Sequence, residues 1–161
     1  MFLEESDYQA RLSILIEAVE DGWMRWHAFC LMGNHEHLLI SVEDDRLAKL
    51  MQRVNRSYAG TFNQLHRRRG RLYAAPYNAV PVISERHLLE LIRYIALNPE
   101  VVGFGRAEGY RWSSYPALVG VVRPLGFIDS APLYEAVGGG ETAPRRIAAL
   151  VSDGRLRKTA V

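Results

Sequence analysis

Two histidines, His35 and His37, are separated by one residue in a segment whose composition predicts a β-strand, residues 35–42. Alternate residues of a strand project from the same face, so the imidazoles of His35 and His37 would point the same way and Glu36 would point the opposite way. Two imidazoles held on one strand can supply half of the ligands of a divalent metal ion, with one or two more needed. Two ordinary surface or core histidines would give the same spacing.

A tyrosine and an asparagine lie one helical turn apart further along the chain. On a helical projection, Tyr94 and Asn98 share a face with His87 and Glu90. A phenol with a polar neighbour one turn away could place its oxygen near a bound metal ion. The alternative is a ring that packs while its hydroxyl stays in solvent, as in most helical tyrosines. His87 and Glu90 could act as bases, although a solvated helix flank is the better interpretation of both.

Basic residues are concentrated in the middle of the chain, although the formal net charge is only +2. Between Arg46 and Ser84 there are eight lysines and arginines and no aspartate or glutamate. Such an asymmetry predicts a surface that binds a polyanion, and arginine suits phosphate because it offers paired donors. The alternative is a solvated, arginine-rich helix end. The candidate DNA-binding residues are Arg53, Arg56, Arg67, Arg68, Arg69 and Arg71, and Tyr73 or Tyr77 could stack on unpaired bases.

The elements that must position these residues follow from hydrophobic periodicity and turn signals. We expect helix, strand, strand, helix, strand and helix at residues 5–20, 23–32, 35–42, 46–66, 77–83 and 84–97, then a loop-rich segment at 100–122. This order is most of a ferredoxin-like α+β sandwich. Only four residues precede the first helix, so we expect the sheet to lack its first strand and to leave backbone groups unpaired.

Several details of these elements can be predicted. Gly33-Asn34 marks a tight turn between the first two strands. Pro81 confines the strand at 77–83 to an edge or a bulge, and the last helix should begin at Ser84 and end before Pro99. The buried face of the first helix should comprise Tyr8, Leu12, Leu15, Ile16 and Val19.

The composition indicates one α+β domain at residues 1–122, followed by a helical tail at 123–161. Hydrophobic residues make up 48% of the chain and charged residues 24%. No stretch approaches the roughly 18 apolar residues that a transmembrane helix needs, so we expect no membrane association. The single cysteine, Cys30, excludes an intramolecular disulfide and fits the reducing cytoplasm.

Three segments together resemble the single-tyrosine HUH transposases, and in particular the REP-associated tyrosine transposases. Residues 30–40 (CLMGNHEHLLI) are similar to the hairpin that carries the two histidines, and residues 93–99 (RYIALNP) to the nucleophile helix, which reads Y-I-x-x-N-P in this branch. Residues 110–115 (YRWSSY) match its W-S-S-Y segment. The resemblance covers about residues 1–120. Glu36 replaces the usual hydrophobic residue, and Gly33 stands where proline is common.

The resemblance implies a metal-dependent strand transferase that acts on single-stranded DNA beside hairpins. His35, His37 and Asn98 would bind Mg²⁺ or Mn²⁺, and Tyr94 would attack the scissile phosphate. The products would be a 5′-phosphotyrosine link and a free 3′-hydroxyl. Family members occur as monomers and homodimers, and in them the first strand is central in the sheet.

Three other interpretations remain open. The chain could be a non-catalytic nucleic-acid-binding module, which explains the arginines but not the convergence of His35, His37, Tyr94 and Asn98. It could be a metal hydrolase in which the histidines activate water. It could also be an inactive, truncated remnant of a transposase.

Overall fold

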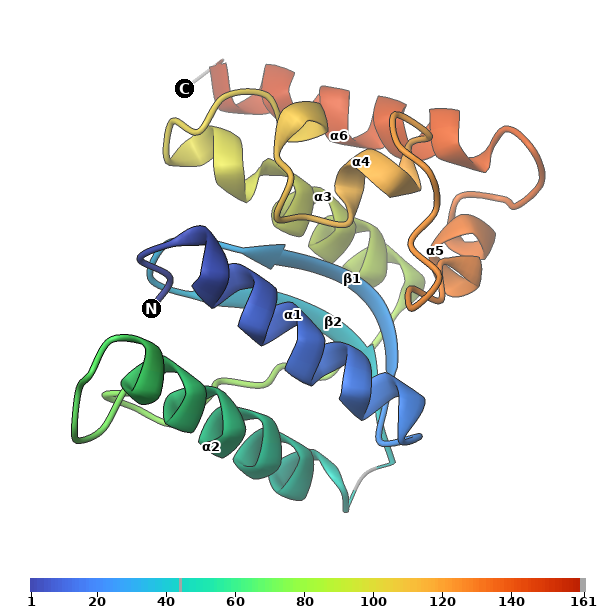
Figure 1. Cartoon of the computed structure of the whole chain (residues 1–161). Helices are drawn as coiled ribbons and strands as arrows, with labels where there is room; N and C mark the ends of the chain where they lie inside the picture. Colours follow the sequence, from blue (N-terminus) through green and yellow to red (C-terminus); the bar gives the residue numbers. More distant parts are fainter. Residues whose placement is uncertain (44, 160–161) are drawn as a thin grey trace.

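The chain forms an α+β fold around one β-hairpin, with helices on both faces (Figure 1). The computed structural model describes residues 1–43 and 45–159. Its elements are α1 (Glu5–Glu20), β1 (Arg25–Leu31), β2 (Glu36–Ser41), α2 (Leu47–Leu65), α3 (Glu85–Val101), a short 3-10 helix η1 (Ala107–Gly109), α4 (Tyr115–Leu118), α5 (Ala131–Ala136) and α6 (Ala143–Thr159). Within the described ranges, no helix has the length and hydropathy to cross a bilayer.

The predicted hairpin is confirmed. β1 and β2 pair antiparallel, with His37 opposite Cys30 and Glu36 opposite Leu31. His35 lies just before β2, and its carbonyl accepts a hydrogen bond of 2.8 Å from the backbone N–H of Met32. The turn between the strands is Gly33-Asn34, as expected.

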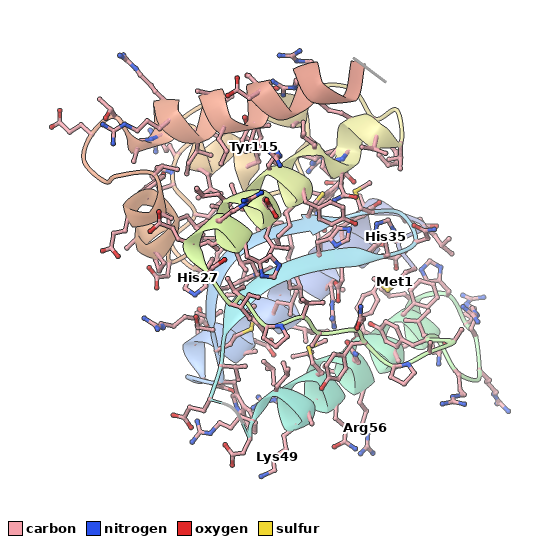
Figure 2. All side chains as sticks on the ribbon, turned by 180° about the vertical axis from the view of Figure 1, so that it is seen from behind. Met1, His27, His35, Lys49, Arg56 and Tyr115 are labelled. Carbon is pink, nitrogen blue, oxygen red and sulfur yellow. The ribbon has the colours of Figure 1, made fainter. Side chains whose placement is uncertain are left out.

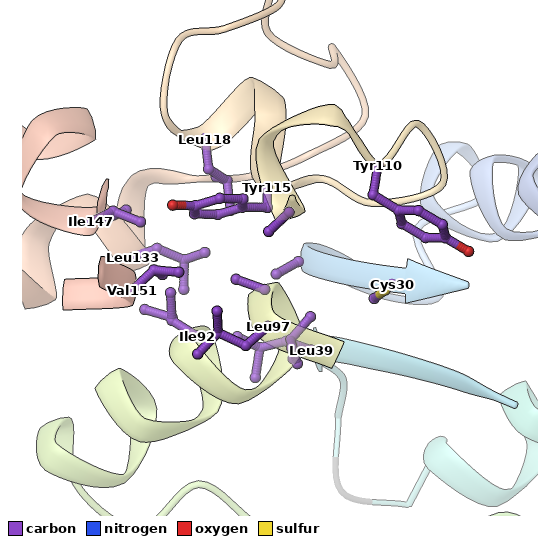
Figure 3. Packing of buried hydrophobic residues seen from close by; sticks show 14 of the residues in the cluster. Cys30, Leu39, Ile92, Leu97, Tyr110, Tyr115, Leu118, Leu133, Ile147 and Val151 are labelled. Atoms are coloured by element: carbon purple, nitrogen blue, oxygen red, sulfur yellow. The ribbon is translucent and has the colours of Figure 1, made fainter. Parts of the chain in front are cut away.

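Each face of the hairpin has its own hydrophobic core. Leu38 and Ile40 of β2 pack toward α1 and α2, whereas Leu39 packs toward α3. α2 turns one apolar face inward, with Leu50, Met51, Val54, Tyr58 and Phe62 buried. On the opposite face, Ile92 and Leu97 of α3 meet Leu133, Ile147 and Val151 (Figure 3). The expected helical end of the chain is therefore α6, and it helps to cover α3.

The predicted buried face of α1 is wrong by about one residue. The buried positions are Asp7, Arg11, Leu15 and Ala18, while four of the expected apolar residues lie at the flanks and are partly buried. Long-range polar partners cause this rotation. The guanidinium of Arg11 is fully buried and forms an ion pair with Glu36, with Nε 2.9 Å from Oε2. It also donates to Val54 O at 3.0 Å and to Asn55 Oδ1 at 2.9 Å.

The two edges of the hairpin differ. The outer edge of β1 is closed by the W-S-S-Y segment, because Leu31 N donates to Trp112 O at 2.8 Å and Ser114 N donates to Phe29 O at 3.1 Å. In the part of the chain that the structure describes, no strand pairs with the outer edge of β2. The sheet thus has two strands rather than the three expected.

The prediction of a strand at residues 77–83 is wrong. This segment has no regular secondary structure and its residues are exposed. An isolated strand cannot satisfy its backbone groups, and Pro81 removes one donor, so the segment stays hydrated without an adjacent sheet edge.

α3 begins as predicted but ends later. The hydroxyl of Ser84 accepts a hydrogen bond of 3.1 Å from the backbone N–H of His87, which caps the helix. The helix continues through Pro99 to Val101, although an end before Pro99 was expected. In the last turn a proline removes a single helical hydrogen bond. Packing against the rest of the core offsets that loss, since Ala96, Leu97, Asn98 and Pro99 are all buried.

Arg155 of α6 ties this end of α3 to η1. Its guanidinium donates to Glu100 at 2.6 Å and to Glu108 at 2.8 Å. Burial would raise the pKa of both carboxyl groups, but hydrogen bonds from Arg155 and from backbone N–H groups outweigh it and lower both pKa values.

We expect Arg11→Met to lower the free energy of unfolding by about 3–5 kcal/mol, because Glu36 would remain as an unpaired, half-buried charge. The double variant Arg11→Met/Glu36→Leu should recover most of the loss, since both charges are then gone. Urea denaturation measures the free energy of unfolding of the single and of the double variant. Arg111→Met, which breaks the exposed pair between Arg111 and Glu5, is the control and should cost less than about 1 kcal/mol. Equal costs for Arg11→Met and Arg111→Met would contradict this assignment.

Acid should weaken the attachment of α6. Because folding lowers the pKa of Glu100 and Glu108, their stabilisation is complete above the ordinary glutamate pKa of about 4.3 and is lost as the pH falls below it. The melting temperature of Arg155→Met should be lower than that of the unmodified chain at pH 7, and the difference should shrink toward pH 3. Arg145→Met, at an exposed position of α6, should show no such difference. A difference in melting temperature between Arg155→Met and the unmodified chain that stays constant with pH would contradict the ion-pair explanation.

Candidate active site

Three rings follow one another on the α3 side of the hairpin. The ring centroids of His35 and His37 are 4.9 Å apart, and those of His37 and Tyr94 are 5.0 Å apart. Both contacts are nearly perpendicular, with interplanar angles of 82° and 78°. The structure therefore brings together a histidine pair from one hairpin and a tyrosine from a distant helix.

The ring nitrogens of the two histidines have different surroundings. His35 Nδ1 lies 2.7 Å from Asn34 Oδ1, a contact that makes Nδ1 the protonated nitrogen and leaves Nε2 with its lone pair. His37 Nε2 is buried and has no hydrogen-bond partner of standard geometry among the described residues, as is also true of one atom each of Trp26, Asn63, Tyr73 and Tyr115. Burial and the neighbouring His35 lower the pKa of His37, against a smaller opposing effect of Asn98. His37 is thus neutral near pH 7, which is the form that binds metal.

Asn98 supplies a third polar group at the same place. Its side chain is 8% exposed, and its Nδ2 donates to the backbone carbonyl of Tyr94 at 2.8 Å. The same side chain interacts with His37, where it favours the charged imidazole and so opposes the lowering of its pKa. The described residues contain no cluster of three or more histidine, cysteine, aspartate or glutamate side chains suited to a metal ion. A cation here would therefore have two imidazoles and one amide oxygen as protein ligands. Imidazole suits transition-metal ions, and the amide oxygen suits harder ions such as Mn²⁺ or Mg²⁺.

Tyr94 is accessible from solvent on a helix that is otherwise anchored in the core. Its side chain is 53% exposed, while the next residues of α3, Ile95 to Leu97, are buried and hold the helix in place. The two candidate bases on the same helix have other partners. Glu90 pairs with Arg86 at 3.2 Å, and His87 Nδ1 accepts a long hydrogen bond of 3.5 Å from Ile83 N.

Glu36 does not enter the site. It points to the α1 side of the hairpin and binds Arg11, so the charged residue between the two histidines belongs to the opposite core. Sequence reasoning correctly placed its side chain on that face but did not identify Arg11 as its partner. No local signal marks a buried arginine in an amphipathic helix.

A hollow beside His35 was also missed. It has a volume of about 320 Å³ and is lined by Met32, Gly33, Asn34, His35, Val102 and Phe104. The side chains of Val102 and Phe104 are 53% and 56% exposed. The signal available in the sequence was an aromatic residue between Gly103 and Gly105, which form a tight and exposed loop.

The basic residues of α2 lie away from the histidines. α2 packs on the face of the hairpin opposite α3, and Arg56 and Lys49 lie on its outer side, far from His35 (Figure 2). Arg53 is paired with Asp21 and lies over the Trp23 ring. Lys49, Gln52, Arg53, Arg56, Ser57 and Gly60 line an open hollow of about 550 Å³.

The arginines after α2 lie closer to the site. The loop that contains Arg67, Arg68, Arg69 and Arg71 is at the same end of the molecule as the turn between β1 and β2 (Figure 1). All four are exposed, and Arg68 lies 5.5 Å from the centroid of the Phe62 ring. The N-terminal residues connect the two regions, because Phe2 N donates to Gly33 O at 2.8 Å and Tyr58 OH donates to Met1 O at 2.9 Å.

The two tyrosines suggested for base stacking differ in accessibility. Tyr73 is half-buried with its hydroxyl inside the protein, and this burial raises its pKa to about 12, so its prediction as an exposed stacking residue is wrong. Tyr77 is 39% exposed and remains available.

Comparison with known proteins finds no counterpart: no family model, curated protein or solved structure matches the chain. A functional assignment therefore rests on the sequence motifs and on the geometry of the site.

Mn²⁺ binding tests whether the two imidazoles act as a ligand pair. Titration calorimetry should show a single Mn²⁺ site that is weakened in His35→Ala and in His37→Ala. Asn34→Ala should weaken it by about 10-fold or more, because Asn34 orients His35. His87→Ala, a histidine on α3 outside the site, should bind like the unmodified chain. Equal Mn²⁺ affinity in all four variants would show that the ion binds elsewhere.

Proposed function

We propose that the chain is a metal-dependent DNA strand transferase with Tyr94 as nucleophile, similar to the REP-associated tyrosine transposases. The observation that carries this proposal is the convergence of Tyr94, His37 and Asn98, from α3 and β2: the rings of His37 and Tyr94 are in contact, and Asn98 interacts with both residues. The observed α+β arrangement is compatible with a ferredoxin-like sandwich, which we propose as its fold family.

The reaction would proceed by displacement at phosphorus. The phenol of Tyr94 loses its proton to solvent, and its oxygen forms a bond to the phosphorus of the scissile phosphodiester. The bond from phosphorus to the 3′ oxygen breaks, and that oxygen takes a proton from water to become a free 3′-hydroxyl. The DNA 5′ end remains linked to Tyr94, so the attack of a 3′-hydroxyl can reverse the steps and rejoin the strand without ATP.

The residues around Tyr94 would orient the phosphate and offset its charge. His35, His37 and Asn98 would hold Mg²⁺ or Mn²⁺, which supplies polarisation of the phosphate and stabilises charge that develops in the transition state. We propose single-stranded DNA adjacent to a hairpin in the DNA as substrate. The exposed arginines Arg67, Arg68, Arg69 and Arg71 would contact its backbone near the site.

The arginines of α2 require a separate interpretation. Arg53 and Arg56 lie on the far face, so they would bind DNA only where it passes around the molecule, such as the double-stranded part of the substrate. In salt titrations, Arg68→Ala should therefore reduce the affinity for a single strand more than Arg56→Ala does.

A covalent adduct tests the proposal. Hairpin-bearing single-stranded DNA incubated with Mn²⁺ should give a protein–DNA species on a denaturing gel, and Tyr94→Phe should abolish it because the nucleophilic oxygen is gone. Tyr77→Phe, which removes the hydroxyl of another exposed tyrosine, should leave it unchanged. EDTA should prevent its formation.

Two results would contradict strand transfer. DNA cleavage without an adduct, indifferent to Tyr94→Phe, would indicate a hydrolase that activates water. DNA binding with neither cleavage nor adduct would indicate a binding module.

A further inference from the structure

We propose that the hollow beside His35 binds one unpaired nucleobase, with Phe104 as the stacking surface. This inference rests on the proposed function and extends it from the reacting phosphate to the adjacent nucleotide. The base would belong to the nucleotide on the 5′ side of the scissile phosphate, whose 3′ oxygen is released.

Phe104 is held rigidly in an exposed position. Gly103 and Gly105 on either side have φ angles of +82° and +92°, a conformation that favours glycine. The backbone N–H of Phe104 donates to Pro99 O at 2.9 Å. Its ring contacts that of Tyr110, with centroids 5.5 Å apart and planes at 30°. The ring nevertheless remains 56% exposed.

The support behind Phe104 is itself fixed. The side chain of Tyr110 is 9% exposed, and its hydroxyl donates to the backbone carbonyl of Leu31 in β1 at 2.7 Å. The loop and the hairpin are thus joined by a buried hydrogen bond. A rigid aromatic surface loses little conformational entropy when a flat ligand stacks on it.

The lining of the hollow suits a base. Met32 and Val102 are apolar, and no carboxylate is among the lining residues. Asn34 adds a polar amide whose oxygen already contacts His35, and its nitrogen has no protein hydrogen-bond partner among the described residues. The volume of about 320 Å³ lies at the lower end of small-ligand sites, which span about 300–1,000 Å³.

The position of the hollow identifies the nucleotide. Asn98 lies one turn after Tyr94 on α3, and Val102 follows one turn later. Tyr94 contacts His37, whereas Val102 and His35 line the hollow. The candidate nucleophile and the hollow therefore lie toward opposite ends of the histidine pair. In an in-line displacement the attacking and leaving oxygens are on opposite sides of phosphorus. With Tyr94 on one side, the leaving 3′ oxygen and its nucleotide would face His35 and the hollow.

Photocrosslinking tests base binding without knowledge of the substrate sequence. Tyr94→Phe protein with Mn²⁺ would be irradiated with 20-nucleotide oligothymidylates that carry one 5-iodouracil, and crosslinked residues would be identified by mass spectrometry. We expect a crosslink at Phe104. Phe104→Ala should weaken oligothymidylate binding by about tenfold, and Phe104→Trp should retain it. Ile83→Ala, at an apolar side chain that is 84% exposed, is the matched control and should bind normally.

Abasic substrates test which nucleotide is bound. On a DNA that forms the adduct, removal of the base 5′ to the scissile phosphate should slow adduct formation by about tenfold, and removal of the 3′ base should have less effect. Phe104→Ala should be slow on intact DNA and insensitive to the 5′ abasic site. If both removals slow Phe104→Ala as much as they slow the unmodified chain, the assignment is wrong.

The outcomes separate this inference from the proposed function. A Phe104 crosslink and weakened binding in Phe104→Ala, without any Tyr94 adduct, would support base binding and contradict strand transfer. Normal DNA binding by Phe104→Ala, with circular dichroism showing a folded chain, would overturn the inference even if the adduct forms. A change in sedimentation of Phe104→Ala without a change in DNA affinity would also overturn it, because the surface would then contact another protein.

Discussion

The ion pair between Arg11 and Glu36 sets the face on which the histidines lie. Arg11 is fully buried, so the loss of its partner would leave an uncompensated charge inside the protein, at a cost of several kcal/mol. A shift of β2 by one residue would move Glu36 to the α3 side and turn the imidazoles toward the α1–α2 core. The ion pair therefore opposes that register and keeps His35 and His37 toward α3. It also explains why a carboxylate can stand between two candidate metal ligands without joining them.

The position of Tyr94 depends on a second set of contacts, which fix α3 in place. α6 lies along α3, and the crossing is close at Gly154, where an added Cβ would come within 2.3 Å of the Arg93 side chain. Arg155 then ties α6 to the carboxylate of Glu100 near the end of α3. These contacts place a mostly exposed phenol against a half-buried imidazole. The C-terminal helices are thus part of the framework that positions the candidate nucleophile, although they contribute no residue to the site.

Features that depend on local chemistry could be predicted from the sequence, and features that depend on distant partners could not. The turn at Gly33-Asn34 and the shared face of Tyr94 and Asn98 follow from short-range geometry. The burial of Arg11 could not be predicted because its partners lie on β2 and α2. The segment 77–83 has a strand-like composition, but a strand needs a neighbouring edge, which composition does not reveal. The functional assignment came from motif resemblance, and the structure adds the proximity that the motifs require.

The central claim is that one cation binds where the histidine pair meets Tyr94. The most direct measurement is the NMR spectrum of the chain with ¹³C-labelled tyrosine, recorded with Mg²⁺ and then with substoichiometric Mn²⁺. Paramagnetic Mn²⁺ broadens nearby signals, so the account predicts that the Tyr94 ring signal disappears first, while that of Tyr58, in the core on the opposite face of the hairpin, persists. Loss of the Tyr58 signal at the same Mn²⁺ concentration, or an unchanged Tyr94 signal at saturation, would contradict the account.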